Sequence, residues 1–138
     1  MLLAAFFPGY LITQIPGSML IQRVGPKLVL FWDMALTALL SLAIPYAARR
    51  SARALAAVLT LMGLVQGPLY AAIQAMKREW LPRGPERALV LRFMSLPYML
   101  SGVLALTVYP MLSVRFGWQA MPIVHGLATG VYSVVWLR

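Results

Sequence analysis

The side chains that could do acid–base, nucleophilic or metal chemistry are scarce in this sequence. Its 138 residues include three acidic residues and one histidine, and cysteine is absent. Acid–base catalysis, a hydrolytic triad and a metal site each need several such groups at defined spacing, and no motif of these kinds is present. We therefore expect no catalytic residue, no metal site, no cofactor and no enzyme activity.

Polar uncharged side chains within long apolar stretches are the remaining candidates for chemistry. Four of them could line a wet cavity and hydrogen-bond a polar or anionic solute: Tyr10, Gln14, Gln66 and Tyr70. The same groups could instead bond across helices. Gln66 is the most informative of the four, because Pro68 follows it closely and irregular backbone is tolerated beside a cavity.

Two charges, Asp33 and Arg92, also fall inside or at the ends of apolar stretches. Such charges are costly in a bilayer and are candidates for function. Each lies about one and a half helical turns from a loop, so Arg92 can extend to the interface and Asp33 can reach it or pair with a base. Two interpretations stay open: anchoring or pairing, and direct work on a substrate or proton.

The elements that must position these side chains are membrane helices. Hydrophobic residues make up 62% of the chain and charged residues 11%, whereas an ordinary soluble domain has about 25% charged residues. A hydrocarbon core of about 30 Å needs roughly 20 helical residues. The sequence predicts an all-α membrane protein of about five spans, at 1–22, 28–48, 54–76, 93–114 and 119–137.

The net charge of +9 comes from bases in short links between the spans, not from one stripe, so we expect no nucleic-acid partner. Consecutive links lie on alternate sides of the membrane, so the basic residues divide into two sets. Arg23, Lys27, Lys77, Arg78, Arg83, Arg87 and Arg138 fall on one side, and Arg49, Arg50, Arg53 and Arg115 on the other. The richer side is predicted to be cytoplasmic.

Two GxxxG pairs are predicted to pack helices closely: Gly63 with Gly67, and Gly126 with Gly130. Small residues at this spacing let two helix backbones approach each other.

Several strings resemble the anion:cation symporter branch of the major facilitator superfamily, which includes sodium/phosphate, sialic acid and vesicular glutamate carriers. FFPGYLITQIPGSML at 6–20 is similar to the second helix of that branch, where FFWGY is followed by TQIPGG. GLVQG at 63–67 resembles GLGEG in its fourth helix, Trp80-Leu81-Pro82 with Glu86-Arg87 resembles its W-P-ER loop, and Phe116-Gly117-Trp118 matches its FGW.

The loop after the first span resembles the superfamily's cytoplasmic loop between helices two and three. Gly17, Arg23, Gly25 and Lys27 are in register, and the usual aspartate is Gln22 here. The resemblance implies that these four residues, together with Glu86 and Arg87, form a cytoplasmic gating and loop set.

The resemblance places the five spans as helices 2–6 of twelve, so residues 1–138 are expected to be a partial N-terminal six-helix bundle. The partners it implies are the lipid bilayer, a small anionic solute, a coupling ion and the missing C-terminal half. The expected function is transport of an organic or inorganic anion, phosphate-like or carboxylate, by sodium- or proton-coupled alternating access.

Two departures weaken that expectation. The branch's helix-four arginine falls on Leu59 and its glutamate on Gln66, so anion affinity or ion coupling could be lost. The alternatives are a non-transporting, multi-pass subunit for assembly or anchoring, and a degraded copy that is not expressed.

Overall fold

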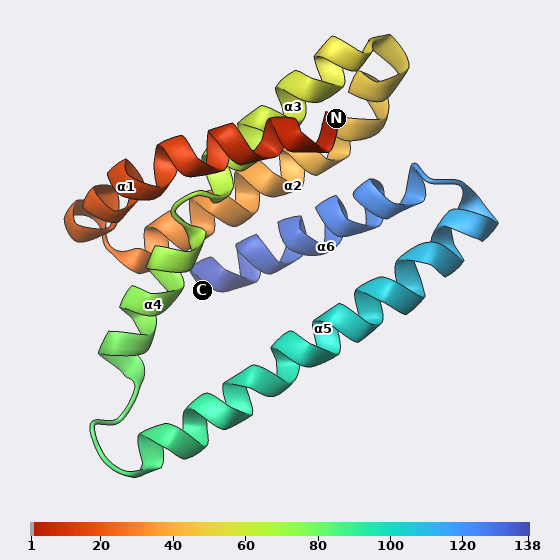
Figure 1. Cartoon of the computed structure of the whole chain (residues 1–138). Coiled ribbons are helices and arrows are strands. Elements are labelled where there is room, and N and C mark those ends of the chain that lie inside the picture. The colour runs from red at the N-terminus through yellow and green to blue at the C-terminus, as the bar shows by residue number, and fades with distance from the viewer. Residues whose placement is uncertain (1) are drawn as a thin grey trace. The chain divides into compact units, whose positions relative to one another are not determined.

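The computed structural model describes residues 2–138, and helices make up nearly all of them (Figure 1). Within that range there is no strand, which confirms the all-α prediction. A short 3-10 helix, Leu2–Ala5, precedes six α-helices: α1 (Phe6–Val24), α2 (Pro26–Arg50), α3 (Ala52–Gln66), α4 (Leu69–Trp80), α5 (Glu86–Phe116) and α6 (Ala120–Leu137).

The helices form two compact parts. The first comprises the chain up to Met76 together with Pro122–Arg138, and the second is Lys77–Met121. The first part holds α1, α2 and α3, the start of α4 and nearly all of α6, whereas the second is mainly α5.

A single glycine joins α1 to α2, where the sequence predicted a link over 23–27. Gly25 has φ of 89°, a conformation that side chains other than glycine's disfavour, and its N–H donates to the carbonyl of Ile21 at 2.9 Å. Pro26 then occupies the first turn of α2, where its missing N–H costs no helical bond. Both helices therefore extend into the expected link.

Ser51 alone separates α2 from α3, where the predicted link was 49–53. Its backbone is extended, and its Oγ accepts a hydrogen bond from the N–H of Ala54 at 3.1 Å. A serine in this position satisfies one of the free N–H groups at a helix start. The cap explains why α3 begins directly after Ser51.

The predicted span 54–76 is not one continuous helix. α3 ends at Gln66, and α4 begins at Leu69 after a turn at Gly67 and Pro68. Proline has no N–H to donate and its ring crowds the preceding turn, so it interrupts the helical hydrogen bonds. The N–H of Ala72 then donates to the carbonyl of Pro68 at 2.9 Å, which restarts the helix.

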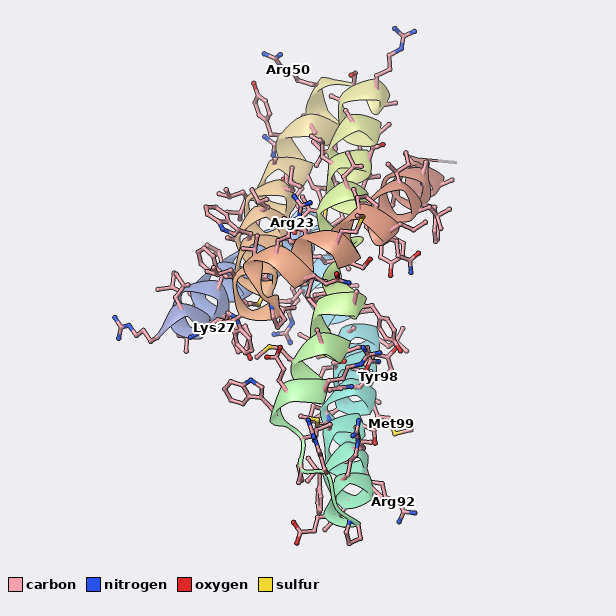
Figure 2. All side chains as sticks on the ribbon, turned by 90° about the vertical axis from the view of Figure 1, so that its left-hand side faces the viewer. Arg23, Lys27, Arg50, Arg92, Tyr98 and Met99 are labelled. Carbon is pink, nitrogen blue, oxygen red and sulfur yellow. The ribbon has the colours of Figure 1, made fainter. Side chains whose placement is uncertain are left out.

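α5 is longer than the predicted span 93–114, because its first turns occupy what was expected to be link. It runs unbroken through Pro97 and Pro110 and has no buried residue. Tyr98 and Met99, which are 83% and 70% exposed, project from it (Figure 2).

The core of the first part lies near the turn between α1 and α2. Buried Ile21, Val29, Leu30 and Ala72 form it, and Trp136 of α6 packs against them. The indole Nε1 of Trp136 donates to the carbonyl of Lys27 at 3.1 Å. This bond ties the end of α6 to the start of α2.

Four segments within residues 2–138 are long and apolar enough to cross a membrane by length and composition: Pro26–Arg50, Ala52–Trp80, Glu86–Phe116 and Ala120–Leu137. They correspond to the last four predicted spans. The first predicted span lies mainly on α1, which does not meet that test; its 19 residues include two glutamines, an arginine, Pro8 and Pro16.

Candidate functional site

Glycines bring the backbones of α1 and α3 into direct contact. A Cβ on Gly9 would meet the carbonyl oxygen of Thr60, and one on Gly63 would meet that of Phe6. One helical turn after Gly63, at the end of α3, a Cβ on Gly67 would meet the side chain of Thr13. Only a residue without a Cβ permits this approach, and it places the polar groups of α1 and α3 beside α2.

Thr60 strengthens the same contact with a long-range hydrogen bond. Its Oγ1 donates to the carbonyl of Ala5 at 3.0 Å, in addition to the carbonyl of Ala56 within its own helix at 3.0 Å. The start of α1 is thereby held against the middle of α3.

A pocket of about 650 Å³ lies within the first part, between α1, α2 and the end of α3. Gly17 and Pro68 both form part of its wall. They lie so close together that a Cβ on Gly17 would come within 2.5 Å of the Pro68 ring. Nearly all of its wall is apolar, with contributions that include Pro16, Leu20, Trp32, Leu36, Leu64 and Val65. The polar side chains that line it are those of Thr13 and Asp33.

Asp33 is buried in the wall of this pocket, with 6% of its surface exposed. Its Oδ1 atom has no hydrogen-bond partner among the described residues. The sequence left two interpretations of Asp33 open. In the first it reaches the membrane interface or pairs with a base, and in the second it acts on a substrate or a proton. Helix packing turns this side of α2 inward, and both interpretations of Asp33 stay predictions.

Asp33 begins a buried polar stripe along α2. Thr37 and Ser41 follow at intervals of four residues, so the three side chains share one face of the helix. Thr37 is 4% exposed and Ser41 is 1% exposed, and the Oγ of Ser41 has no partner among the described residues. Burying these polar side chains inside an apolar bundle costs free energy unless they form hydrogen bonds. The stripe is therefore a candidate for a role in packing or function.

Gln66 of α3 contacts the middle of this stripe. Its Nε2 donates to Oγ1 of Thr37 at 3.4 Å, and both side chains are at least partly buried. Sequence reasoning selected Gln66 but missed Thr37. The four-residue spacing of Asp33, Thr37 and Ser41, which places three polar side chains on one helix face, would have indicated Thr37.

The other three predicted cavity residues lie away from the pocket. Tyr10 is half-buried and stacks on Phe6, with ring centroids 5.9 Å apart. Gln14 is exposed on α1, and Tyr70 is 62% exposed on α4. None of the four predicted residues, Gln66 included, is among those that line the pocket.

The predicted loop set falls on both parts of the chain. Gly17 is buried beside Pro68, whereas Arg23 and Lys27 are exposed on either side of Gly25. Lys27 lies at the opposite end of α2 from Arg50 (Figure 2). Glu86 and Arg87 form the exposed first turn of α5 in the second part.

The second glycine pair faces α2. A Cβ on Gly126 would come within 2.9 Å of the Ala38 carbonyl oxygen, and one on Gly130 would lie 3.6 Å from the Cβ of Ala38. α6 thus approaches α2 closely along this side.

Within residues 2–138, no group of three His, Cys, Asp or Glu side chains is placed to hold a metal ion. The buried polar side chains of the described residues are instead Asp33, Thr37 and Ser41 on α2 and Ser133 on α6, each within an apolar helix. This arrangement is typical of an all-α, multi-pass membrane bundle, in which polar side chains face other helices or a cavity.

The sequence profile of the Major Facilitator Superfamily matches residues 1–138. The chain belongs to this superfamily of transporters, and it is an integral, multi-pass membrane protein.

Its relatives are the kind of carrier that the sequence motifs indicated. The chain is 32% identical to sialin of Ovis aries over 136 residues, which cover 99% of this chain and 27% of sialin. It is 31% identical to vesicular glutamate transporter 2 of Mus musculus over 137 residues, covering 99% of this chain and 23% of that protein. With a chloroplastic ascorbate transporter of Arabidopsis thaliana the identity is 30% over 135 residues, covering 98% and 25%. The resemblance is confirmed, and the chain spans about a quarter of the length of these relatives.

Proposed function

We propose that this chain is part of a carrier that moves an organic or inorganic anion, either phosphate-like or carboxylate, across a membrane. The carrier works by alternating access, with binding near mid-membrane between two halves. Transport is coupled to sodium or protons. The chain contributes helices 2–6 of a twelve-helix plan and belongs to the N-terminal half.

One observation carries this proposal: relatives that match nearly the whole chain are named as anion, ascorbate and glutamate transporters. Sialin, the vesicular glutamate transporter and the ascorbate transporter all align over nearly the whole chain. The superfamily match over residues 1–138 supports the same mechanism class.

Within this carrier, Tyr10, Gln14, Gln66 and Tyr70 are proposed to line the transport cavity. The hydrogen bond from Gln66 to Thr37 supports a polar role for this level of α3, because it holds the amide among buried helices. Gln14 and Tyr70 are exposed in the described chain and are therefore free to face a cavity formed with the other half.

Gly17, Arg23, Gly25, Lys27, Glu86 and Arg87 are proposed to act at the cytoplasmic gate. Arg23 and Lys27 are exposed on either side of the turn at Gly25. Exposed bases of this kind can change salt-bridge partners as a carrier opens and closes.

The experiment is uptake into liposomes that contain the protein expressed from its complete reading frame. Labelled phosphate, sialic acid, glutamate and ascorbate are offered separately, under an imposed sodium gradient or an imposed proton gradient. Gradient-driven accumulation of one anion, absent from protein-free liposomes, is the expected result. Failure of every anion under both gradients refutes the transport proposal.

A second candidate function is a non-transporting subunit that serves assembly or anchoring. Leu59 and Gln66, where the resembling carriers have an arginine and a glutamate, favour it, because a site without these charges has less to attract an anion or carry a proton. Its discriminator is the coding sequence on both sides of this chain. Stops at both ends favour a subunit, whereas an in-frame first helix and six further helices favour a carrier.

A further inference from the structure

The pocket between α1, α2 and α3 has the dimensions of a small-molecule site. Its volume of about 650 Å³ lies within the roughly 300–1,000 Å³ typical of ligand pockets, which are mostly apolar with a few polar groups. Its residues belong to one compact part of the chain.

Asp33 is the single ionisable side chain among the described residues that line the pocket. The other polar side chain, Thr13, already donates its hydroxyl to the carbonyl of Gly9 at 3.1 Å. The electrostatic character of the pocket is therefore set by one carboxyl group.

That carboxyl group is buried and incompletely satisfied. Asp33 is 6% exposed, and its Oδ1 has no hydrogen-bond partner among the described residues. A carboxylate with an unpaired oxygen in apolar surroundings is disfavoured, and a cation that reaches the carboxyl group from the pocket would reduce that penalty. Asp33 thus favours a positively charged occupant over an anion.

The walls distinguish an organic cation from a metal ion. A hard metal ion takes several oxygen ligands, but the lining side chains other than Asp33 and Thr13 are apolar. The same apolar walls suit the hydrocarbon body of an organic ammonium. Trp32, which lines the pocket next to Asp33, adds an aromatic ring of the kind that attracts such cations.

We propose that this pocket binds a small organic ammonium ion, with the Asp33 carboxylate against the charged nitrogen and the walls of α1, α2 and α3 around its apolar body. This proposal does not depend on the proposed anion transport, although Gly17 of the proposed gate forms part of the pocket wall. None of Tyr10, Gln14, Gln66 and Tyr70 lines it.

The test measures binding of labelled benzyltrimethylammonium to the natural chain in lipid nanodiscs by equilibrium dialysis, with empty nanodiscs subtracted. The matched neutral probe is neopentylbenzene, which has the same shape with carbon in place of nitrogen, and the matched anion is benzoate. Saturable binding of the ammonium is expected. The neutral probe should compete at least about tenfold less well, because charge-assisted contacts are worth about a factor of ten or more, and benzoate should not compete.

Three variants locate the site. Asp33→Asn keeps the side-chain shape and should weaken ammonium binding by about tenfold or more. Leu36→Trp keeps the carboxyl group but fills the pocket, so it should abolish saturable binding. Ser41→Ala changes a buried group on the same face of α2 that does not line this pocket, and it should bind as the natural chain does. Circular dichroism and gel filtration establish that each variant is folded.

The proposal is overturned if the natural chain shows no saturable ammonium binding, or if neopentylbenzene or benzoate competes equally. It is also overturned if folded Asp33→Asn or folded Leu36→Trp binds as tightly as the natural chain. Should one of these two variants fail to fold, the other decides the outcome together with the probe series.

Discussion

Gln66 of α3 donates a hydrogen bond from Nε2 to Oγ1 of Thr37 on α2, at 3.4 Å. The bond joins two helices that are neighbours in the bundle, and it lies one turn along α2 from buried Asp33. A polar contact between membrane helices is worth about 0.6 kcal/mol on average and rarely above about 1.7 kcal/mol.

Gln66→Leu and Thr37→Val should therefore be coupled. A double-mutant cycle on unfolding in detergent should give an interaction energy of about 0.5–1 kcal/mol, because each single variant already removes the shared bond. The control pair is Gln14→Leu with Thr37→Val, since Gln14 is exposed on α1. Additive effects in the Gln66 pair would show that the bond contributes nothing to stability.

Gly63 should tolerate no added methyl group. Gly63→Ala places a Cβ against the Phe6 backbone and within 3.0 Å of the Tyr10 nitrogen. Backbone atoms cannot move aside as a flexible side chain can, so we expect a loss of about 1–3 kcal/mol.

The matched control is Gly102→Ala on α5, where a Cβ has nothing within 4 Å. That change should be neutral or stabilise by up to about 1 kcal/mol, because alanine favours a helix over glycine. Thermal unfolding in detergent compares the two variants. Equal stability of both would contradict the close α1–α3 contact.

Gly25 should resist substitution for a different reason. Its φ of 89° is strained for any residue with a side chain, although a Cβ there would have space. Gly25→Ala should cost about 1–3 kcal/mol. Gly84→Ala is the control, since Gly84 also has space around it and does not have a positive φ. If both variants unfold at the same temperature, the turn is not held as described.

The membrane orientation can be tested because the chain has no cysteine. Lys27→Cys and Arg50→Cys mark opposite ends of α2, a helix of 25 residues. In sealed right-side-out vesicles, an impermeant maleimide should label Arg50→Cys, and it should label Lys27→Cys after the membrane is permeabilised. Labelling of both from the same side would show that α2 does not cross the bilayer, and the reverse pattern would invert the predicted topology.

The sequence was sufficient to predict the helices, because apolar stretches of about 20 residues have few alternatives in a membrane. It placed the turns at Gly25 and Ser51 within a few residues. It did not predict that α5 would begin at Glu86, because a short segment with mixed charges has no apolar period to reveal a helix. The break at Gly67 and Pro68 was visible only as a tendency to kink.

The pocket could not be predicted, for a physical reason. Whether Asp33 faces lipid, water or another helix depends on how α2 is rotated about its axis, and packing against α1 and α3 sets that rotation. The close approach of α1 and α3 depends in turn on Gly9, Gly63 and Gly67 acting together. The rotation of α2 therefore depends on residues far apart in the chain, and no single stretch of sequence predicts it.

The unbroken course of α5 also determines which solvent its two ends meet. Its 31 residues make a rod of about 46 Å, whereas the hydrocarbon layer is about 30 Å and the bilayer with its headgroups about 40–45 Å. The uncharged stretch 93–114 is about 33 Å long and matches the hydrocarbon. Arg92, directly before this stretch, therefore falls at the depth of the phosphates and glycerol esters, whereas Arg87, about 9 Å before Phe93, reaches the outer edge of the headgroup layer. Lipid headgroups, and not bulk water, are then the medium in which the guanidinium group of Arg92 must be neutralised.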